Sequence, residues 1–444
     1  MLGAVELNGG DTAWVLASAA LVLLMTPGLA FFYGGMVRAK SVINMMLMSL
    51  IAACVVSVLW VMYGYSMTFG DSGSAWIGTL DFSGLGALVD AVPNNGGEYP
   101  IPLLAFAAFQ LMFAVITAAL ISGAIADRAK FVAWTVFVAV WVTVVYFPVA
   151  HWVFDFGTLV DDTVTGAGYL AGQGVLDFAG GTAVHINAGA AALALAIVLG
   201  RRVGFKKDPM RPHSIPLVIL GAAMLWFGWF GFNAGSALGA NGTAALAFIN
   251  TQVAAAAAIG GWLIVEKLRN GHMTGLGAAS GAVSGLVAIT PACAFVAPWA
   301  AVVLGFVAGI LCALAIGLKY RFGFDDSLDV VGVHLVSGLW GTAAIGIFAT
   351  TTVNELGADG VLYGGGTDLL VKQILGAAMV TAFSFVATFV IGLVIEKTIG
   401  FRIDRNAELE GIDLSEHAES AYEFDQRTGT GSFGTLSTRL ETSS

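Results

Sequence analysis

Long apolar segments recur along the whole chain, and they limit the possible folds more than any other feature. Of the 444 residues, 58% are hydrophobic and only 11% are charged, whereas a soluble domain carries about 25% charged residues. A helix of about 20 apolar residues crosses a bilayer. The sequence therefore predicts an all-α, polytopic membrane protein with eleven transmembrane helices. The predicted spans are 12–36, 41–69, 102–126, 131–153, 178–200, 214–238, 243–267, 274–293, 298–319, 330–350 and 369–396.

The basic residues support this number of spans, because nearly all of them fall in alternate loops or in the C-terminal segment. Only Lys372 lies elsewhere. Cytoplasmic loops of membrane proteins carry an excess of Lys and Arg. The sequence therefore predicts an odd number of spans, with the N-terminus outside and the C-terminus inside. The residues on the predicted inner side are Arg38, Lys40, Arg128, Lys130, Arg201, Arg202, Lys206, Lys207, Arg211, Lys267, Arg269, Lys319, Arg321, Lys397, Arg402, Arg405, Arg427 and Arg439.

Two pairs of similar motifs, each pair separated by five spans, indicate an internal repeat. PGLAFFYGGM in the first span and WFGWFGFNAGS in the sixth are both rich in aromatic residues and glycine. DFAGGTAVHINAG in the fifth span and DVVGVHLVSGLWG in the tenth each contain an Asp, a turn with glycine and a histidine. A repeat unit with an odd number of helices must cross the bilayer in opposite directions. We therefore predict two inverted five-helix repeats, 12–200 and 214–350, followed by the eleventh helix at 369–396.

The segment Asp177–Gly200 is apolar enough to cross a bilayer and yet contains His185. An ionisable residue inside a membrane indicates a functional site by default, although a histidine that only packs against a neighbouring helix is the simpler alternative. His334 lies at the corresponding place in the other repeat and enters from the opposite side. Two neutral imidazoles in file could pass on a small polar molecule. We therefore predict a narrow, apolar pore with both histidines towards the middle of the membrane.

Aromatic residues are the predicted constrictions of this pore. Phe109 and Phe113 are four residues apart, and Trp229 and Phe232 are three apart, so the members of each pair share one helix face. Aromatic residues at this spacing also occur in cores or facing lipid, and that alternative stays open. Ser236 lies one turn beyond Phe232 on the predicted outer side. A hydroxyl beside aromatic faces would form a cage for a small cation.

These motifs resemble those of the ammonium transporter (Amt/Mep/Rh) family. The resemblance extends from GLAFFYGGMVRAKSVINMM near the start, through DFAGGTAVHINAGAAAL, FGWFGFNAGS and DVVGVHLVSGLWGT, to GIDLSEHAESAY in the tail. It implies a homotrimer of eleven-helix subunits with one pore in each subunit. It also implies that His185 and His334 are the pore pair, that Phe113 and Phe232 are the stacked gate, and that Asp177 is a structural residue near the outer vestibule.

The resemblance further implies an outer recruitment site for ammonium that includes Ser236, Phe109 and Trp229. Family members commonly place Trp at the end of the AHWV run, where this chain has Phe154. Phe is a weaker cation–π partner than Trp and lacks the indole N–H. We therefore expect Phe154 to contribute to the cage but to hold ammonium more loosely.

The expected function is ammonium transport across the plasma membrane, and no enzymatic activity is expected. Desolvation would drive loss of a proton at the pore entrance, since a charged ammonium in low dielectric costs far more than ammonia. Ammonia would then pass the histidines, with or without coupled proton movement. Methylammonium could be a second substrate. No metal, cofactor or nucleic acid is expected. Cys54, Cys293 and Cys312 lie within apolar spans at unrelated spacings, which fits small buried hydrophobic residues and neither disulfides nor a metal cluster.

Three other classes of membrane protein fit parts of the pattern. A sensor of the same fold would normally carry an appended signalling domain, and none is expected beyond Phe401. A haem protein could use His185 and His334 as axial ligands and would then show a Soret absorption band. A transporter of larger organic cations would need a carboxylate deep in the pore, whereas Asp177 and Asp329 lie near helix ends.

The predicted membrane domain, residues 1–399, is followed by a segment of charged and polar residues. Residues 400–424 resemble the regulatory cytoplasmic tail of the family, which joins neighbouring subunits and receives the trimeric PII nitrogen-regulatory protein. Residues 425–444 are rich in Gly, Ser and Thr and are expected to be disordered.

Charge complementarity predicts where this tail binds. Residues 404–423 are acidic, and the loop 201–211 is basic. Exposed ion pairs contribute little one by one, so we expect several pairs to act together with apolar contacts. The apolar side chains expected to take part are those of Ile412, Leu414 and Tyr422.

Overall fold

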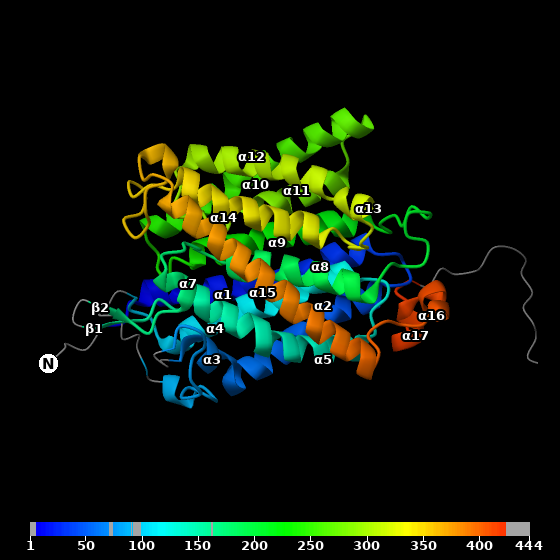
Figure 1. The fold of residues 1–444 in the computed structure, drawn as a ribbon, viewed down its shortest axis with the longest axis horizontal. Helices are drawn as coiled ribbons and strands as arrows, with labels where there is room; N and C mark the ends of the chain where they lie inside the picture. The colour runs from blue at the N-terminus through cyan, green and yellow to red at the C-terminus, as the bar shows by residue number, and fades with distance from the viewer. Residues whose placement is uncertain (1–5, 71–73, 90, 92–98, 161–162, 423–444) are drawn as a thin grey trace, which may run out of the picture.

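Long apolar helices lie side by side along one direction of the molecule, with loops at both ends of the bundle (Figure 1). This computed structural model describes residues 6–70, 74–89, 91, 99–160 and 163–422. The predicted disorder of residues 425–444 therefore concerns a segment outside the described residues.

Ten helical segments in the described part of the chain are long and apolar enough to cross a membrane. Several of them contain a π-helical or 3-10 turn, labelled η. The segments are α1 (Gly9–Met36); α2 (Val42–Leu59) with η1 (Trp60–Gly64) and α3 (Tyr65–Phe69); α4 (Leu103–Ile121) with η3 (Ser122–Ile125); α5 (Phe131–Trp141) with η4 (Val142–Tyr146) and α6 (Phe147–Phe154); η5 (Gly181–Ile186) with α8 (Asn187–Leu199); α9 (Ile215–Gly235); α10 (Gly242–Asn270); α12 (Pro298–Ala315) with α13 (Leu318–Phe322); η6 (Val331–Leu335) with α14 (Val336–Phe348); and α15 (Asp368–Thr398).

A further apolar helix, α11 (Gly275–Ile289), occupies the predicted span 274–293 but has only 15 residues. At about 1.5 Å per residue it is roughly 22 Å long, which is shorter than the hydrocarbon core of about 30 Å. Most of its residues are buried among the other helices. Each of the eleven predicted spans thus contains an apolar helix, but only ten in the described part of the chain are long enough to cross a membrane, so the number eleven stays a prediction.

The remaining elements are short and lie between the spans or, for α16 and α17, after the last span. A two-stranded antiparallel hairpin, β1 (Thr158–Val160) and β2 (Thr163–Thr165), pairs Leu159 with Val164 and is a small departure from the predicted all-α fold. The other short elements are η2 (Gly86–Leu88), α7 (Tyr169–Gly172), η7 (Val361–Tyr363), α16 (Arg405–Glu410) and α17 (Ile412–His417).

The first helices of the two predicted repeats pack closely against each other. α1 runs along α9, and a Cβ atom at Gly221 of α9 would lie 2.2 Å from the backbone nitrogen of Phe32 in α1. Only glycine allows two helix backbones to approach so closely. α15 crosses the outside of the bundle obliquely and contacts α8 and α14 (Figure 1). This packing brings η5 and η6, the histidine-bearing turns of the two repeats, into contact.

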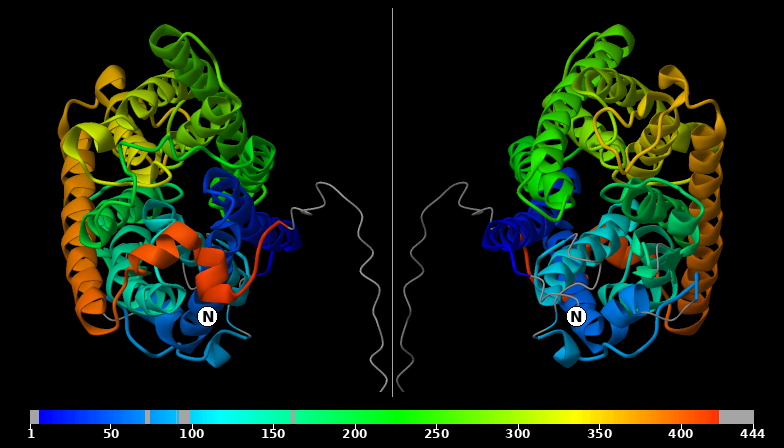
Figure 2. Two further views of the ribbon diagram at one scale, coloured as in Figure 1. Left: turned by 90° about the vertical axis from the view of Figure 1, so that its right-hand side faces the viewer. Right: turned by 90° about the vertical axis from the view of Figure 1, so that its left-hand side faces the viewer.

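The loops with basic residues gather at one end of the bundle, together with the tail. Arg201 Nε donates a hydrogen bond to the carbonyl oxygen of Gly323, and the backbone N–H of Ile403 donates to Arg128. Figure 2 shows α16 and α17 lying across this end. The loops therefore alternate between the two ends as the basic residues predict.

Candidate pore site

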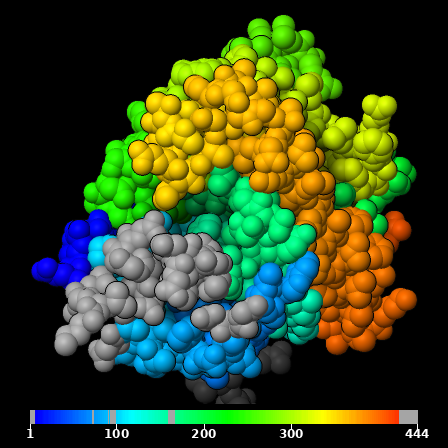
Figure 3. Space-filling model, turned by 60° about the vertical axis from the view of Figure 1, so that its left-hand side comes forward, coloured from blue at the N-terminus to red at the C-terminus, as the bar shows by residue number. Residues whose placement is uncertain are grey.

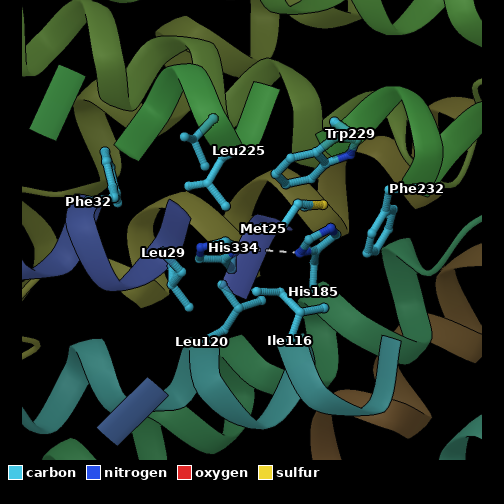
Figure 4. A pocket seen from close by; sticks show the side chains of 11 residues that line it. Met25, Leu29, Phe32, Ile116, Leu120, His185, Leu225, Trp229, Phe232 and His334 are labelled. Atoms are coloured by element: carbon cyan, nitrogen blue, oxygen red, sulfur yellow. Dashed lines mark hydrogen bonds between the residues drawn. The ribbon is translucent and has the colours of Figure 1, made fainter. Parts of the chain in front are cut away.

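The two predicted pore histidines face each other. His185 lies in η5 and His334 in η6, two π-helical turns that precede α8 and α14. Their Nδ1 atoms are 3.2 Å apart, and their ring centroids are 5.3 Å apart with 22° between the planes (Figure 4). Both side chains are buried. At this distance one Nδ1 must donate a hydrogen and the other must accept it, which two neutral rings can do.

A buried carboxylate fixes the start of the helix that carries His185. Asp177 Oδ1 accepts hydrogen bonds from the backbone N–H groups of Gly180 and Gly181, each at 2.8 Å. Its Oδ2 accepts from Thr182 at 2.7 Å and from Ala183 at 3.1 Å. Burial raises the pKa of Asp177, and these four hydrogen bonds oppose that rise. Asp177 thus satisfies the N–H groups that a helix leaves unpaired at its start.

The counterpart of Asp177 in the second repeat is Asp326, and not Asp329 as the motif comparison suggests. Asp326 accepts hydrogen bonds from the backbone N–H groups of Val330 at 3.1 Å and Val331 at 2.7 Å, at the start of η6. Asp329 forms an ion pair with Lys319 at 2.7 Å instead. Asp326 precedes His334 by as many residues as Asp177 precedes His185. This equal spacing is the sequence signal that identifies it.

Aromatic rings form a continuous row that leads to His185. Trp229 stacks on His185 with ring centroids 5.4 Å apart, and the Phe232 ring is 5.9 Å from it. Phe113 packs on Phe232 at 4.3 Å, and Phe109 packs on Phe113 at 4.9 Å. The four aromatic side chains are buried, so they do not face lipid.

A small apolar cavity adjoins both histidines (Figure 4). It offers about 10 Å³ to the centre of a water-sized molecule, which is about the room that one water molecule requires. Nε2 of His185 is buried and has no hydrogen-bond partner among the described residues. An unpaired buried polar atom costs free energy, so a small polar molecule in the cavity would be stabilised there. The apolar walls include Met25, Leu29, Phe32, Ile116, Leu120 and Leu225.

Of the predicted recruitment residues, Phe154 ends α6 and Ser236 follows α9 at the end of the bundle opposite to the tail, the end that Figure 3 shows, whereas Trp229 lies deeper, on His185. Ser236 follows the last turn of α9, and its hydroxyl donates to the carbonyl oxygen of Phe232 at 2.8 Å. A Cβ atom at the adjacent Gly235 would lie 2.9 Å from the Phe109 ring, which places Ser236 close to that end of the row. Phe154 lies apart from this row, against the turn at Gly180, where a Cβ atom would come within 3.6 Å of its ring.

Two polar contacts near the site were not assigned from the sequence. Asn187 accepts a hydrogen bond from the Ser384 hydroxyl at 2.7 Å and so joins α8 to α15. The hydroxyls of Thr182 and Thr342 are 3.3 Å apart and join the two histidine-bearing helices. A polar residue within an apolar span is the only signal for such contacts, because the partner depends on how the helices pack.

The tail contacts the loops of the basic end, as predicted, but its carboxylates bind the starts of helices. Asp413 accepts hydrogen bonds from the backbone N–H groups of Ile43 at 3.0 Å and Asn44 at 2.8 Å, in the first turn of α2. Glu416 accepts from the N–H of Phe131 at 3.0 Å, at the start of α5. Carboxylates are stabilised at helix N-termini by the unpaired N–H groups and by the helix dipole.

The predicted basic loop takes part mainly through its backbone. Glu408 is buried, accepts a hydrogen bond from the N–H of Val203 at 2.6 Å and pairs with Arg402 at 2.8 Å. Ile412 is buried as predicted. The prediction for Leu414 is wrong, because this residue is 63% exposed.

Comparison with known proteins places these observations in a family. Residues 13–422 match the model of the Ammonium Transporter Family. An ammonium transporter of Mycobacterium bovis is 53% identical over an alignment that covers 95% of this chain and 92% of that protein. The crystal structure of Saccharomyces cerevisiae Mep2 has a TM-score of 0.82 at 33% identity, covering 90% of this chain and 89% of that one. A structure described as Sensor Amt Protein has a TM-score of 0.81 at 30% identity and covers 92% of this chain and 98% of that one.

Proposed function

This chain belongs to the ammonium transporter family, and we propose from that premise that ammonia crosses it through the cavity beside His185 and His334. The protein is an ammonium transporter and a multi-pass protein of the plasma membrane, and its family consists of transporters and not of enzymes. The proposal concerns the route through the protein and the chemical form that moves along it.

The contact between the two histidines carries the proposal. The cavity has apolar walls and room for about one small molecule, so a charged ammonium would lose its hydration there without gaining a counter-ion. Neutral ammonia can donate and accept hydrogen bonds, and Nε2 of His185 is available to it. Loss of the proton before entry follows from the cost of a bare charge in low dielectric.

Recruitment is assigned to the end of the aromatic row beside Ser236. The oxygen of Ser236 can still accept a hydrogen bond while its hydrogen is donated to Phe232. The face of Phe109 would attract a cation there, and Phe154 contributes from the neighbouring turn. Trp229 stacks on His185 and lines the cavity, so its role would be in the upper pore beyond the gate. Phe113 and Phe232 are in contact and act as the gate between this site and the cavity.

Assembly and regulation complete the proposal. The subunits form a homotrimer, and a PII-type protein binds the end of the molecule that carries the tail and the basic loops. That end faces the cytoplasm by the positive-inside rule. Methylammonium uses the same route, and the proton either returns outside or follows ammonia through the pore.

The test is the current on a solid-supported membrane when ammonium is added to proteoliposomes. Replacing His185 and His334 together by Leu should abolish selective ammonium transport, since neither ring can then hydrogen-bond the passing molecule. His272, which is exposed, is the matched control, and His272→Ala should transport normally. Uptake of labelled methylammonium by the same vesicles detects transport that moves no charge. Unchanged uptake by the double variant would rule out the proposed route.

The gate is tested in the same vesicles. Phe232→Ala removes the ring that packs on Phe113 and should change the ammonium flux or allow potassium to compete. Wild-type flux with wild-type discrimination against potassium would contradict the gate.

Sensing is a second candidate function, because the Sensor Amt Protein structure is similar over nearly its whole length. A sensor would bind ammonium without sustained flux. Binding that saturates without uptake or current in the wild-type vesicles would favour that function over transport.

A further inference from the structure

α5 and α15 are neighbours towards the end of the bundle that carries the tail (Figure 1). A surface groove lies between them. Its volume is about 410 Å³. Val136 and Val140 of α5 form one wall, and Val390 and Val394 of α15 form the other together with Ile399, which directly follows α15. These five side chains are between 38% and 55% exposed. The two walls can contact a flexible hydrocarbon chain from both sides, which a flat helix face cannot do.

The groove offers no polar group that needs a partner. Thr398, its one polar lining residue, donates its hydroxyl hydrogen to the carbonyl oxygen of Val394 at 2.7 Å. Glu396, on the same helix, accepts hydrogen bonds from the backbone N–H groups of Phe401 and Arg402. An occupant of the groove itself must therefore be apolar.

Two lysines lie at the tail-side end of the groove. Lys130 directly precedes α5, and a Cβ atom at Gly400 would lie 3.0 Å from its Nζ, so the ammonium group lies beside the end of α15. Lys397 is exposed in the last turn of α15. Within the described residues neither ammonium group has a carboxylate partner, in contrast to Arg402, which pairs with Glu408.

We propose that the groove between α5 and α15 binds an acyl chain of an anionic phospholipid whose phosphate contacts Lys130 and Lys397. An apolar groove that ends at two unpaired cations matches a molecule with a hydrocarbon chain and an anionic head. A basic site between membrane helices has this preference for anionic head groups. The site lies outside the row of rings and the cavity, so it is independent of the transport route.

Native mass spectrometry of the full-length protein in detergent tests the proposal. The protein is titrated separately with dioleoylphosphatidylglycerol and dioleoylphosphatidylcholine. The tightest site on each subunit should prefer phosphatidylglycerol. Lys130→Ala with Lys397→Ala should weaken its binding about 30-fold, which is roughly 2 kcal/mol at about 1 kcal/mol per lysine. Binding of phosphatidylcholine should not change.

Lys372→Ala is the matched control, because Lys372 lies at the other end of α15 and pairs with Asp368. It should bind both lipids like the wild type. The double variant Val140→Phe with Val394→Phe fills the groove and should weaken the binding of both lipids. Equal melting temperatures without added lipid show that the variants are folded.

Two results would overturn the proposal. One is unchanged phosphatidylglycerol affinity in the double lysine variant, which would mean that the head group binds elsewhere. The other is dissociation of the oligomer when the groove is filled, which would mean that a second copy of the chain occupies it.

Discussion

Single carboxylates hold the two histidines in register. Asp177 and Asp326 bind backbone N–H groups at the starts of η5 and η6, and the histidines follow at the same spacing. Because each turn is fixed at its first residues, the Nδ1 atoms of His185 and His334 can lie 3.2 Å apart. Neither carboxylate needs to bond to an imidazole for this. These aspartates therefore act as positioning residues.

Replacing Asp177 by Ala should lower both stability and transport. Four buried N–H groups would lose their acceptor, and a lost helix cap together with unsatisfied donors costs about 2–4 kcal/mol. Asp177→Asn keeps one acceptor oxygen, so its stability and transport should lie between those of the wild type and of Asp177→Ala. Thermal unfolding in detergent measures the stability, with Asp368→Ala, at an exposed ion pair, as the control. Equal melting temperatures for all three variants would contradict the capping role.

At the scale of elements, the tail is joined to the bundle by helix starts. α16 and α17 place Asp413 at α2, Glu416 at α5 and Glu408 at the loop before α9. The loop that holds Glu408 also contains Arg202, which pairs with Asp325 at 2.9 Å, next to the capping residue Asp326. The tail thus contacts the same loops that position the helix of His334.

Asp413→Asn combined with Glu416→Gln should release the tail and lower transport. A neutral amide is a weaker acceptor than a carboxylate for N–H groups at a helix start. Trypsin should then cleave faster at the exposed Arg405, and uptake should fall. Glu410→Gln changes an exposed carboxylate of α16 and should leave both rates unchanged.

Truncation extends this test to the partner. A chain that ends at Gly400 should transport less and should not retain a PII protein in a pull-down. A chain that ends at Phe424 should transport ammonium and retain the PII protein like the full-length chain. Normal behaviour of the shorter chain would mean that the tail is only a solvated terminus.

At the scale of the whole molecule, the two ends of the bundle differ in charge. Basic loops and the tail share one end, and α9 and α14 finish at the other. The positive-inside rule then predicts that the tail faces the cytoplasm.

Labelling with a membrane-impermeant maleimide tests this orientation in intact cells. In a chain without its three native cysteines, Asp81→Cys should be labelled from outside, and Arg211→Cys should react only after the membrane is permeabilised. Both positions are accessible in the structure. The reverse pattern would invert the proposed orientation. Multi-angle light scattering of the same purified protein should give the mass of a trimer.

The sequence by itself determined the helices, their alternation and most of the row of rings. Apolar length identifies a span because no water is present in the bilayer to satisfy the backbone, and a spacing of three or four residues places two rings on one face. The two histidines were predicted as functional residues because an ionisable group in hydrocarbon is costly.

Only the tertiary structure decided which groups meet. The 3.2 Å contact of His185 with His334, the contact of Phe113 with Phe232 and the place of Phe154 against Gly180 join residues far apart in the chain. Such distances depend on helix packing at single positions like Gly221, where α1 and α9 almost touch. Periodicity along one helix contains no information about its rotation relative to another helix.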